Sequence, residues 1–189
     1  MKNTIIAVKL FIMLTIITGV IYPLAITGFA QLVYPSKANG SMIIQANKLI
    51  GSELIGQQFT RPEYFWGRPS AISNNPMPSG GSNLSPVGKA FKDIFQSRVD
   101  TIRKYHGYIS IEKIPKDLLF ASASGVDPQI SPNAAYFQVD RIANYRHFTL
   151  EQKSKLKKII KTSIENPDLF IFGEQRINVF KLNLKLTEL

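Results

Sequence analysis

The feature that most constrains this sequence is an uncharged run close to its N-terminus. Residues 10–36 contain no charged side chain, and Lys9 and Lys37 bound the run. Its apolar part, residues 10–30, would form a helix of roughly 31 Å, which matches a hydrocarbon core of about 30 Å. The sequence therefore predicts one transmembrane helix over residues 10–33. A single helix cannot enclose a pore, so the chain is either an anchored domain or one subunit of a larger assembly.

A cleaved secretory signal is the alternative interpretation of this segment. Lys2 and Lys9 would form its positive region, and the Gly-Phe-Ala sequence at residues 28–30 could serve as a cleavage site. The apolar run is longer than the core of most signal peptides and contains Pro23, which favours a retained signal anchor. The two lysines indicate that residues 1–9 form a cytoplasmic tail. Residues 34–189 are then expected outside the cytoplasm, as a single domain.

Small and hydroxyl-bearing residues recur at three- and four-residue spacing within the span: Thr15, Thr18, Gly19, Tyr22 and Ala25. In a regular helix they share one face, and such a face favours close contact with another membrane helix. Pro23 cannot donate a hydrogen bond to the carbonyl of Gly19, so we expect a kink near this turn. The alternative is that an anchor surrounded by the lipid bilayer carries these residues by chance.

The composition after the span limits the possible chemistry. The chain contains no cysteine, which excludes disulfides, thiol catalysis and iron–sulfur clusters. Residues 37–189 contain 21 basic and 13 acidic residues, a net charge of +8. This charge would suit nucleic acid, an anionic membrane surface or an acidic protein, or would simply be solvated. The lysine-rich stretch at 153–161 lacks interleaved aromatic residues, and an exported domain meets little nucleic acid, so no nucleic-acid partner is expected.

Residues 60–83 form a long loop by every local signal, because proline and glycine are frequent there. Yet the loop contains three consecutive aromatic residues followed by an arginine: Tyr64, Phe65, Trp66 and Arg68. A long loop with this composition either packs back on its own domain or contacts a partner. We therefore interpret these four residues as a candidate partner-docking loop.

The remaining patterns predict an α+β fold, with helices packed on a small sheet. Short strands and turns are expected within residues 39–59, and a short strand at 108–111. Helix-start signals predict helices from Ser85 to about His106, from Ser131 to about Arg146, and from Thr149 to the Asn-Pro pair at 166–167. Alternating apolar residues at 176–186 predict a final strand.

No set of residues suggests catalysis or a metal site. The two histidines, at positions 106 and 147, follow or end predicted helices. Ser122 and Ser124 lack the preceding glycine of a nucleophile elbow. Residues 78–83 could bind phosphate through backbone amides, but they lack the Lys-Ser/Thr pair of a P-loop and suit a simple turn. We assign no catalytic residue, cofactor or metal to this chain.

Several unusual strings occur in order along the chain. They lie at residues 51–57, 64–71, 79–84, 117–132 and 179–186, and accompany Tyr22-Pro23-Leu24 in the span. Together they closely resemble the C subunit of the bacterial Kdp potassium-transporting P-type ATPase. The longest string holds the family-motif turn, whose residues are Ser122, Ser124, Gly125, Asp127 and Pro128. The chain departs from the family pattern at Gln129, Gln175 and Ser85, which puts in doubt only a role for a histidine in this turn.

The resemblance implies a non-catalytic subunit of an inner-membrane complex that hydrolyses ATP to import potassium. Its partners would be a potassium-binding, channel-like subunit and an ATP-hydrolysing subunit, so ATP and potassium belong to the complex. The family is described as a catalytic chaperone that raises the ATP affinity of the hydrolysing subunit. Because the expected topology leaves only residues 1–9 in the cytoplasm, such an effect would have to pass through the span. The alternative is an anchored, exported binding domain or enzyme that acts outside a transport complex.

Overall fold

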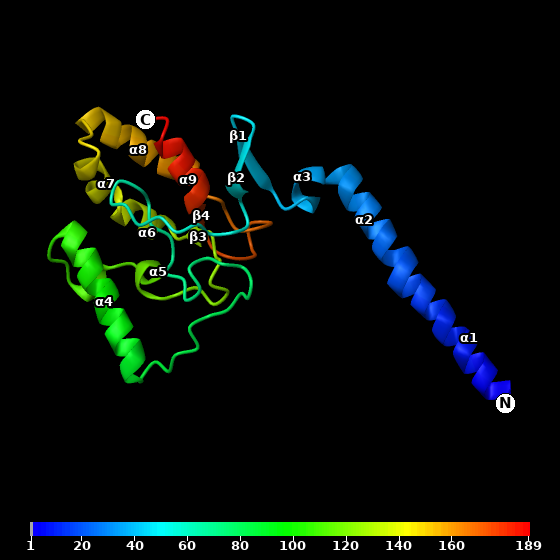
Figure 1. Cartoon of the computed structure of the whole chain (residues 1–189). Coiled ribbons are helices and arrows are strands. Elements are labelled where there is room, and N and C mark those ends of the chain that lie inside the picture. The colour runs from blue at the N-terminus through cyan, green and yellow to red at the C-terminus, as the bar shows by residue number, and fades with distance from the viewer. Residues whose placement is uncertain (1) are drawn as a thin grey trace. The chain divides into compact units, whose positions relative to one another are not determined.

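The computed structural model describes residues 2–189 and divides the chain into two compact units, one ending at Ser52 and the other comprising Glu53–Leu189 (Figure 1). The first unit is helical and ends in a two-stranded hairpin, whereas the second consists of short helices around a two-stranded sheet. This mixture confirms the predicted α+β class.

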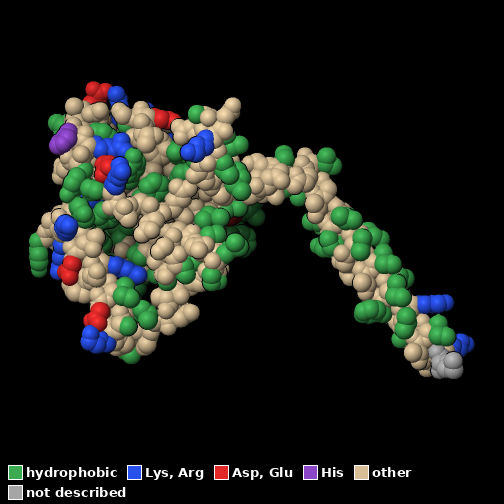
Figure 2. All heavy atoms as spheres, viewed as in Figure 1, with side chains coloured by type: hydrophobic (Ala, Val, Ile, Leu, Met, Phe, Trp, Pro, Cys, Tyr) green, Lys and Arg blue, Asp and Glu red, His purple; other side chains and the backbone are tan. Residues whose placement is uncertain are grey.

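A long apolar helix dominates the first unit. It comprises α1 (Lys2–Ile16), a π-helical segment (Ile17–Ile21) and α2 (Tyr22–Val33). Among the described residues, this is the one helix long and apolar enough to cross a membrane, and none of its most apolar window is buried. Apolar side chains cover its length, with Lys2 and Lys9 near its start (Figure 2). The helix includes the predicted span at 10–33, and residues 2–9 of the expected tail are helical too.

The π-helical segment lies where Pro23 was expected to disturb the helix. The backbone N–H of Tyr22 donates to the carbonyl of Ile17, five residues earlier, and the hydroxyl of Thr18 donates to the carbonyl of Leu14 at 2.8 Å. The wider turn accommodates the missing donor of Pro23. One extra residue per turn rotates the following positions by about 100° relative to a regular helix.

The π-helical segment lies within the expected packing face, which stays a prediction. Thr15 and Gly19 remain on one face, and the Cγ2 atom of Thr15 lies 4.0 Å from where a Cβ on Gly19 would stand. Tyr22 and Ala25 follow the wide turn, so they are rotated away from the stripe that the regular period predicted. Of the five residues, we therefore expect Thr15, Thr18 and Gly19 to contribute most to a contact with another helix.

A hairpin completes the first unit. After the short helix α3 (Pro35–Ala38), strand β1 (Met42–Gln45) pairs antiparallel with β2 (Lys48–Ser52). The turn residues Ala46 and Asn47 both have positive φ, as a two-residue hairpin turn requires. The expectation of short strands and tight turns within residues 39–59 is thus confirmed for this hairpin.

The second unit contains six α-helices among the described residues, one short 3₁₀ helix and a minimal sheet. The helices are α4 (Lys89–His106), α5 (Lys116–Leu119), α6 (Pro132–Phe137), α7 (Val139–Tyr145), α8 (Leu150–Thr162) and α9 (Val179–Leu186). Strand β3 (Gln129–Ile130) pairs antiparallel with β4 (Ile177–Asn178). One apolar core joins these elements, with fully buried residues from α4, α6, α8 and α9. These helices therefore fix the positions of the loops between them.

Of the three helix starts predicted from the sequence, those at Thr149 and Ser131 are confirmed and the one at Ser85 is wrong. Thr149 caps α8 as expected, because its side chain accepts from the backbone of Gln152 while Gln152 bonds back to the backbone of Thr149. Ser131 caps α6, although the predicted helix to Arg146 is broken at Gln138 into α6 and α7. The prediction at Ser85 is wrong by one turn: Gly88 bonds back to Ser85, and α4 begins at Lys89.

Two predicted strands are wrong. Residues 108–110 precede the 3₁₀ turn Ile111–Lys113 and belong to neither described sheet. The C-terminal strand is instead helix α9, because the side chain of Asn178 accepts from the backbone of Lys181 and caps a helix after two strand residues. Buried residues in α9 follow helical spacing, at 179, 182, 183 and 186. The apolar residues at 180, 182, 184 and 186 alternate with polar residues, which is the pattern of a half-buried strand.

Candidate functional site

The aromatic loop and the family-motif turn come together in the second unit, although more than fifty residues separate them. Arg68 and Asp127 form an ion pair at 3.0 Å. The hydroxyl of Ser70 donates to the carbonyl of Gly125 at 2.6 Å, and the backbone N–H of Ser122 donates to Pro69 at 3.0 Å. We call this contact between residues 66–74 and 121–128 the loop–turn junction.

Close backbone approach holds the loop–turn junction together. Gly125 has a φ of +73°, and a Cβ there would lie 2.5 Å from the side chain of Ile72 and 2.6 Å from the carbonyl of Gly80. The amide of Gly80 donates to the carbonyl of Ser124, while the Ser124 hydroxyl accepts from the amide of Val126. The turn also joins α9, because the carbonyl of Pro128 accepts from the amide of Val179. Ser122 is buried, so every family-motif residue serves an internal contact.

This geometry also decides the interpretation of residues 78–83. The amide of Gly80 is bonded within the domain, and a Cβ on Gly81 would lie 2.9 Å from the carbonyl of Ala123. Helix α4 begins at Lys89, so no helix N-terminus follows directly at Ser85. The segment is irregular rather than a turn over residues 79–83, and its glycines pack against the family-motif turn instead of leaving their amides open to a phosphate.

The aromatic loop packs back on its own domain. Phe65 is fully buried, and its backbone exchanges two hydrogen bonds with the side chain of Asn183, at 2.8 and 3.0 Å. The backbone of Trp66 makes the equivalent pair with Gln138, at 2.7 and 3.1 Å. The candidate docking loop therefore needs a correction: Phe65 is a core residue, because two buried amides anchor the backbone beside it. Tyr64, Trp66 and Arg68 remain partly exposed.

A buried arginine lies beneath Trp66. Arg141 is 2 % exposed, and its guanidinium carbon stands 3.8 Å from the centre of a Trp66 ring. The guanidinium donates to the carbonyls of Pro62 and Tyr64, to the Gln138 side chain and to Nε2 of His106. No carboxylate of the described residues forms an ion pair with it. This cation is therefore balanced by carbonyl dipoles and an aromatic face.

Burial changes the acid–base properties of this pair. Burial lowers the pKa of Arg141 to about 9, so the guanidinium still carries its charge at neutral pH. Burial, together with the charge of Arg141, lowers the pKa of His106 to about 4. His106 is thus neutral, accepts the hydrogen bond from Arg141 and stacks on Phe137 with ring centres 4.6 Å apart. His106 therefore acts here as a neutral hydrogen-bond acceptor beside the core.

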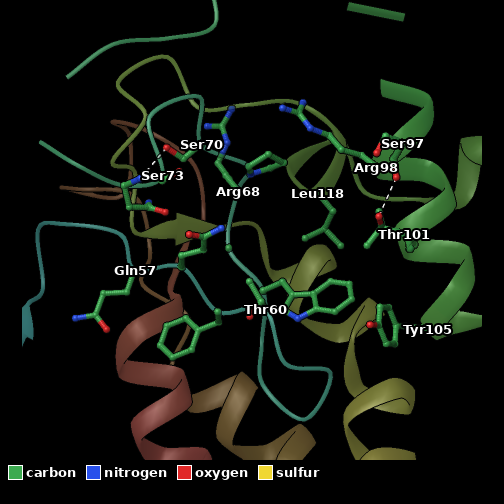
Figure 3. Close-up of a pocket in the computed structure, with 17 residues that line it drawn as sticks. Gln57, Thr60, Arg68, Ser70, Ser73, Ser97, Arg98, Thr101, Tyr105 and Leu118 are labelled. Atoms are coloured by element: carbon green, nitrogen blue, oxygen red, sulfur yellow. Dashed lines mark hydrogen bonds between the residues drawn. The ribbon is translucent and has the colours of Figure 1, made fainter. Parts of the chain in front are cut away.

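A pocket of about 350 Å³ opens between the loop–turn junction and α4 (Figure 3). Trp66 and Tyr105 line one part of it, and Arg68 and Arg98 another. Arg98 donates to the carbonyl of Leu119 at 2.6 Å, and burial lowers its pKa. The Nε atom of Arg68 is buried and has no hydrogen-bond partner. No acidic residue lines the pocket, so it suits a small polar or anionic group better than a cation.

The arrangement offers binding groups and no evident acid–base pair. Among residues 2–189, no cluster of three or more His, Cys, Asp or Glu side chains could hold a metal ion. The two histidines do not form a pair with each other: His106 is hydrogen-bonded to Arg141, and His147 follows the end of α7. The chemistry that the described residues provide is hydrogen bonding, charge and aromatic packing.

Nearly the whole chain matches a known protein family. The family described as "K+-transporting ATPase, c chain" covers residues 4–188. The chain therefore belongs to the KdpC family. Similar proteins include the potassium-transporting ATPase KdpC subunits of Polaromonas naphthalenivorans, 47% identical over 97% of this chain and 93% of the relative, and of Polynucleobacter asymbioticus, 46% identical over 94% and 93%. The subunit of Photorhabdus laumondii is 46% identical over 97% of this chain and 94% of its own.

Membership of the KdpC family confirms the resemblance drawn from the sequence strings. It makes the chain a subunit of a potassium-transporting ATPase, and the single apolar helix agrees with a single-pass membrane subunit. Two of those strings, at residues 64–71 and 117–132, meet in the loop–turn junction, and a third, at 79–84, contacts it through the hydrogen bond from Gly80 to Ser124.

The sequence alone did not single out Gln138, Arg141 and Asn183, although they hold the aromatic loop. The sequence did contain a signal for Gln138 and for Asn183. Gln138 follows Ala134 and Ala135 at the spacing of one buried helical face, and a polar residue on such a face needs a buried partner. Asn183 is likewise a polar residue within the apolar run of α9.

Proposed function

We propose that this KdpC-family chain is a non-catalytic subunit that assembles with a potassium-binding, channel-like subunit and an ATP-hydrolysing subunit. The observation that carries the proposal is the apolar helix Lys2–Val33, whose most apolar window is entirely unburied within the chain. Gly19 and Thr15 offer a small, polar contact surface on it, of the kind that favours close helix packing. The loop–turn junction supports the same function, because its motif residues stabilise the domain rather than react.

The proposed topology places residues 1–9 in the cytoplasm and residues 34–189 outside it. Lys2 and Lys9 support this orientation through the positive-inside rule. ATP binds on the cytoplasmic side, so an effect of this subunit on the ATP affinity of the hydrolysing subunit is transmitted by contacts of the span. In thermodynamic terms, the span packs better against one conformation of its partner and shifts the population towards it.

Replacement of Gly19 tests the assembly surface. Gly19→Leu places a large side chain on the contact face, so less of the two larger subunits should co-purify with an affinity-tagged chain in mild detergent. Gly28→Leu is the matched control, because no atom lies within 4 Å of its Cβ position and it follows the wide turn. Ile17→Leu is a second control that conserves volume. Equal recovery of the partners from all three variants would contradict the proposed surface.

Cysteine labelling tests the orientation. Because the chain has no native cysteine, only the introduced cysteine is labelled. Ser79→Cys, in an exposed part of the second unit, should react with an impermeant maleimide in intact spheroplasts. Asn3→Cys should react only after lysis. The reverse pattern would place the large domain in the cytoplasm and would reopen direct contact with the nucleotide-binding subunit.

An anchored binding domain that acts alone is the second candidate, and the pocket beside α4 is the observation that favours it. Co-purification also separates the two functions. A chain that leaves the membrane as a monomer under conditions that preserve the transporter would support the independent domain. Migration with two larger membrane subunits would support the transport subunit.

A further inference from the structure

A short hairpin between α8 and α9 projects from the second unit (Figure 1, orange). Its base is closed by two backbone hydrogen bonds between Glu165 and Arg176, at 2.8 and 3.1 Å. Nearer its end, Asp168 and Phe172 exchange two more, at 2.8 and 2.9 Å. The hairpin is therefore an ordered structure with a defined end.

Four consecutive large apolar residues form the end of this hairpin. Their exposed fractions are 79 % for Leu169, 89 % for Phe170, 78 % for Ile171 and 64 % for Phe172. We call residues 169–172 the apolar tip. Burial normally stabilises such side chains, so a contiguous exposed group marks a contact surface rather than a chance exposure.

The backbone of the apolar tip holds these side chains outward. Leu169 and Phe170 have φ values of +52° and +63°, in the left-handed region that bulky residues rarely adopt. The turn is supported from below, because Arg176 forms ion pairs with Glu165 at 3.5 Å and with Asp168 at 3.4 Å. Arg176 therefore offsets part of the acidic charge near the tip, which comes from Glu165, Asp168 and Glu174.

Three observations favour the lipid bilayer as the surface that covers the apolar tip. The chain carries its own membrane helix, so a bilayer is always at high effective concentration around the second unit. The tip is a protruding turn, which can enter the bilayer interface without a preformed pocket. The part of the chain after the span has a net charge of +8, which attracts anionic lipid headgroups.

We propose that the apolar tip inserts into the interfacial region of the bilayer and forms a second, reversible membrane contact of this subunit. The span anchors the chain, and the tip restricts how the second unit moves above the membrane. This contact depends on the anchor but not on which side of the membrane the domain occupies.

Fluorescence quenching of a labelled full-length chain tests this inference. Phe170→Cys introduces the single cysteine of the chain at the tip, where an apolar nitrobenzoxadiazole label replaces the ring. Leu150→Cys is the matched control, since Leu150 is an equally exposed apolar residue at the start of α8, with 87 % exposed. The chains are reconstituted into vesicles of phosphatidylethanolamine and phosphatidylglycerol, with and without lipids that carry a nitroxide on the upper acyl chain.

The label at position 170 should be quenched by the nitroxide lipids and shielded from aqueous iodide, and the label at position 150 should show the opposite. Adding Leu169→Ser and Phe172→Ser should lower the ratio of inserted to free tips by about tenfold or more, because apolar burial is lost. Circular dichroism should show an unchanged fold, since both residues are exposed.

Two results would overturn the inference. Equal iodide quenching at positions 170 and 150, without quenching by nitroxide lipids, would show that the tip stays in water. Shielding of position 170 only in the assembled transporter, again without lipid quenching, would show that the tip contacts a partner subunit instead.

Discussion

Arg141 shows how single residues hold the aromatic loop of this domain. A buried cation is costly unless its donors are satisfied, and here carbonyl groups, an amide and a neutral imidazole satisfy them. The planar guanidinium also covers the face of Trp66. Arg141 therefore connects the loop to α7. Lysine could not replace it, since an ammonium group lacks the planar array of five N–H donors of a guanidinium.

Removal of this guanidinium should destabilise the domain strongly. Arg141→Met removes the donor to the carbonyl oxygen of Tyr64 and to Nε2 of His106, so we expect a loss of about 3 kcal/mol in the free energy of unfolding. Thermal unfolding of the full chain in detergent, followed by circular dichroism, measures the change. Arg61→Met is the control, because the side chain of Arg61 is 76% exposed and its loss should cost less than about 0.5 kcal/mol. Similar unfolding temperatures for both variants would contradict the role of Arg141.

His106 should make the stability of the domain sensitive to acid. Its pKa is lowered from 6.5 to about 4 by burial and by the neighbouring Arg141, so the folded state resists protonation while the unfolded chain accepts the proton. The free energy of unfolding should therefore fall as the pH decreases from 6.5 to 4, and this contribution should level off below 4. His106→Gln keeps an acceptor for Arg141 and cannot titrate. The variant should lose this part of the acid dependence in unfolding temperatures measured across the range, and an unchanged pH profile would refute the assignment.

At the scale of elements, local signals predicted the helices better than the strands. The capping box of α8 and the Ser-Pro start of α6 act through neighbouring backbone groups, so a few residues suffice to recognise them. The alternating residues of 179–186 were misread as a strand, because the alternation outweighed the local cap at Asn178, and the burial of Asn183 depends on its distant contact with Phe65. The loop–turn junction escaped prediction for the same reason, although its residues had been singled out one by one.

The close packing of the loop–turn junction should make Gly125 intolerant of any side chain. Gly125→Ala places a Cβ within 2.6 Å of the carbonyl of Gly80, in addition to the cost of its positive φ. We expect a loss of about 2 to 3 kcal/mol in unfolding free energy. Gly173→Ala is the matched control, because it has a φ of +90° but its Cβ would meet no atom closer than 3.8 Å, so only the backbone cost of about 1 kcal/mol should remain. Equal losses in the two variants, measured by thermal unfolding, would show that crowding at the turn is unimportant.

For the whole molecule, the central question is whether the span acts only as an anchor or also as a contact surface. The chain separates into a unit that contains the membrane helix and a unit that contains the loop–turn junction. If the span is only an anchor, any apolar helix of the same length will serve. If it transmits an effect on ATP affinity, its own sequence around Thr15 and Gly19 is required.

Replacement of residues 10–33 by an unrelated leucine–alanine helix separates these possibilities. The chimaera should still insert, because length and hydropathy are kept, and its second unit should unfold at the same temperature as the original. We expect fewer co-purified partner subunits and a higher KM for ATP in the complexes that do form, measured as ATP hydrolysis at varied nucleotide concentration. A chain in which only residues 3–8 are changed to other uncharged residues, with Lys2 and Lys9 kept, serves as the control. If the chimaera supports the same KM and the same recovery of partners, the span is a simple tether, and any influence on ATP must arise from contacts of the second unit.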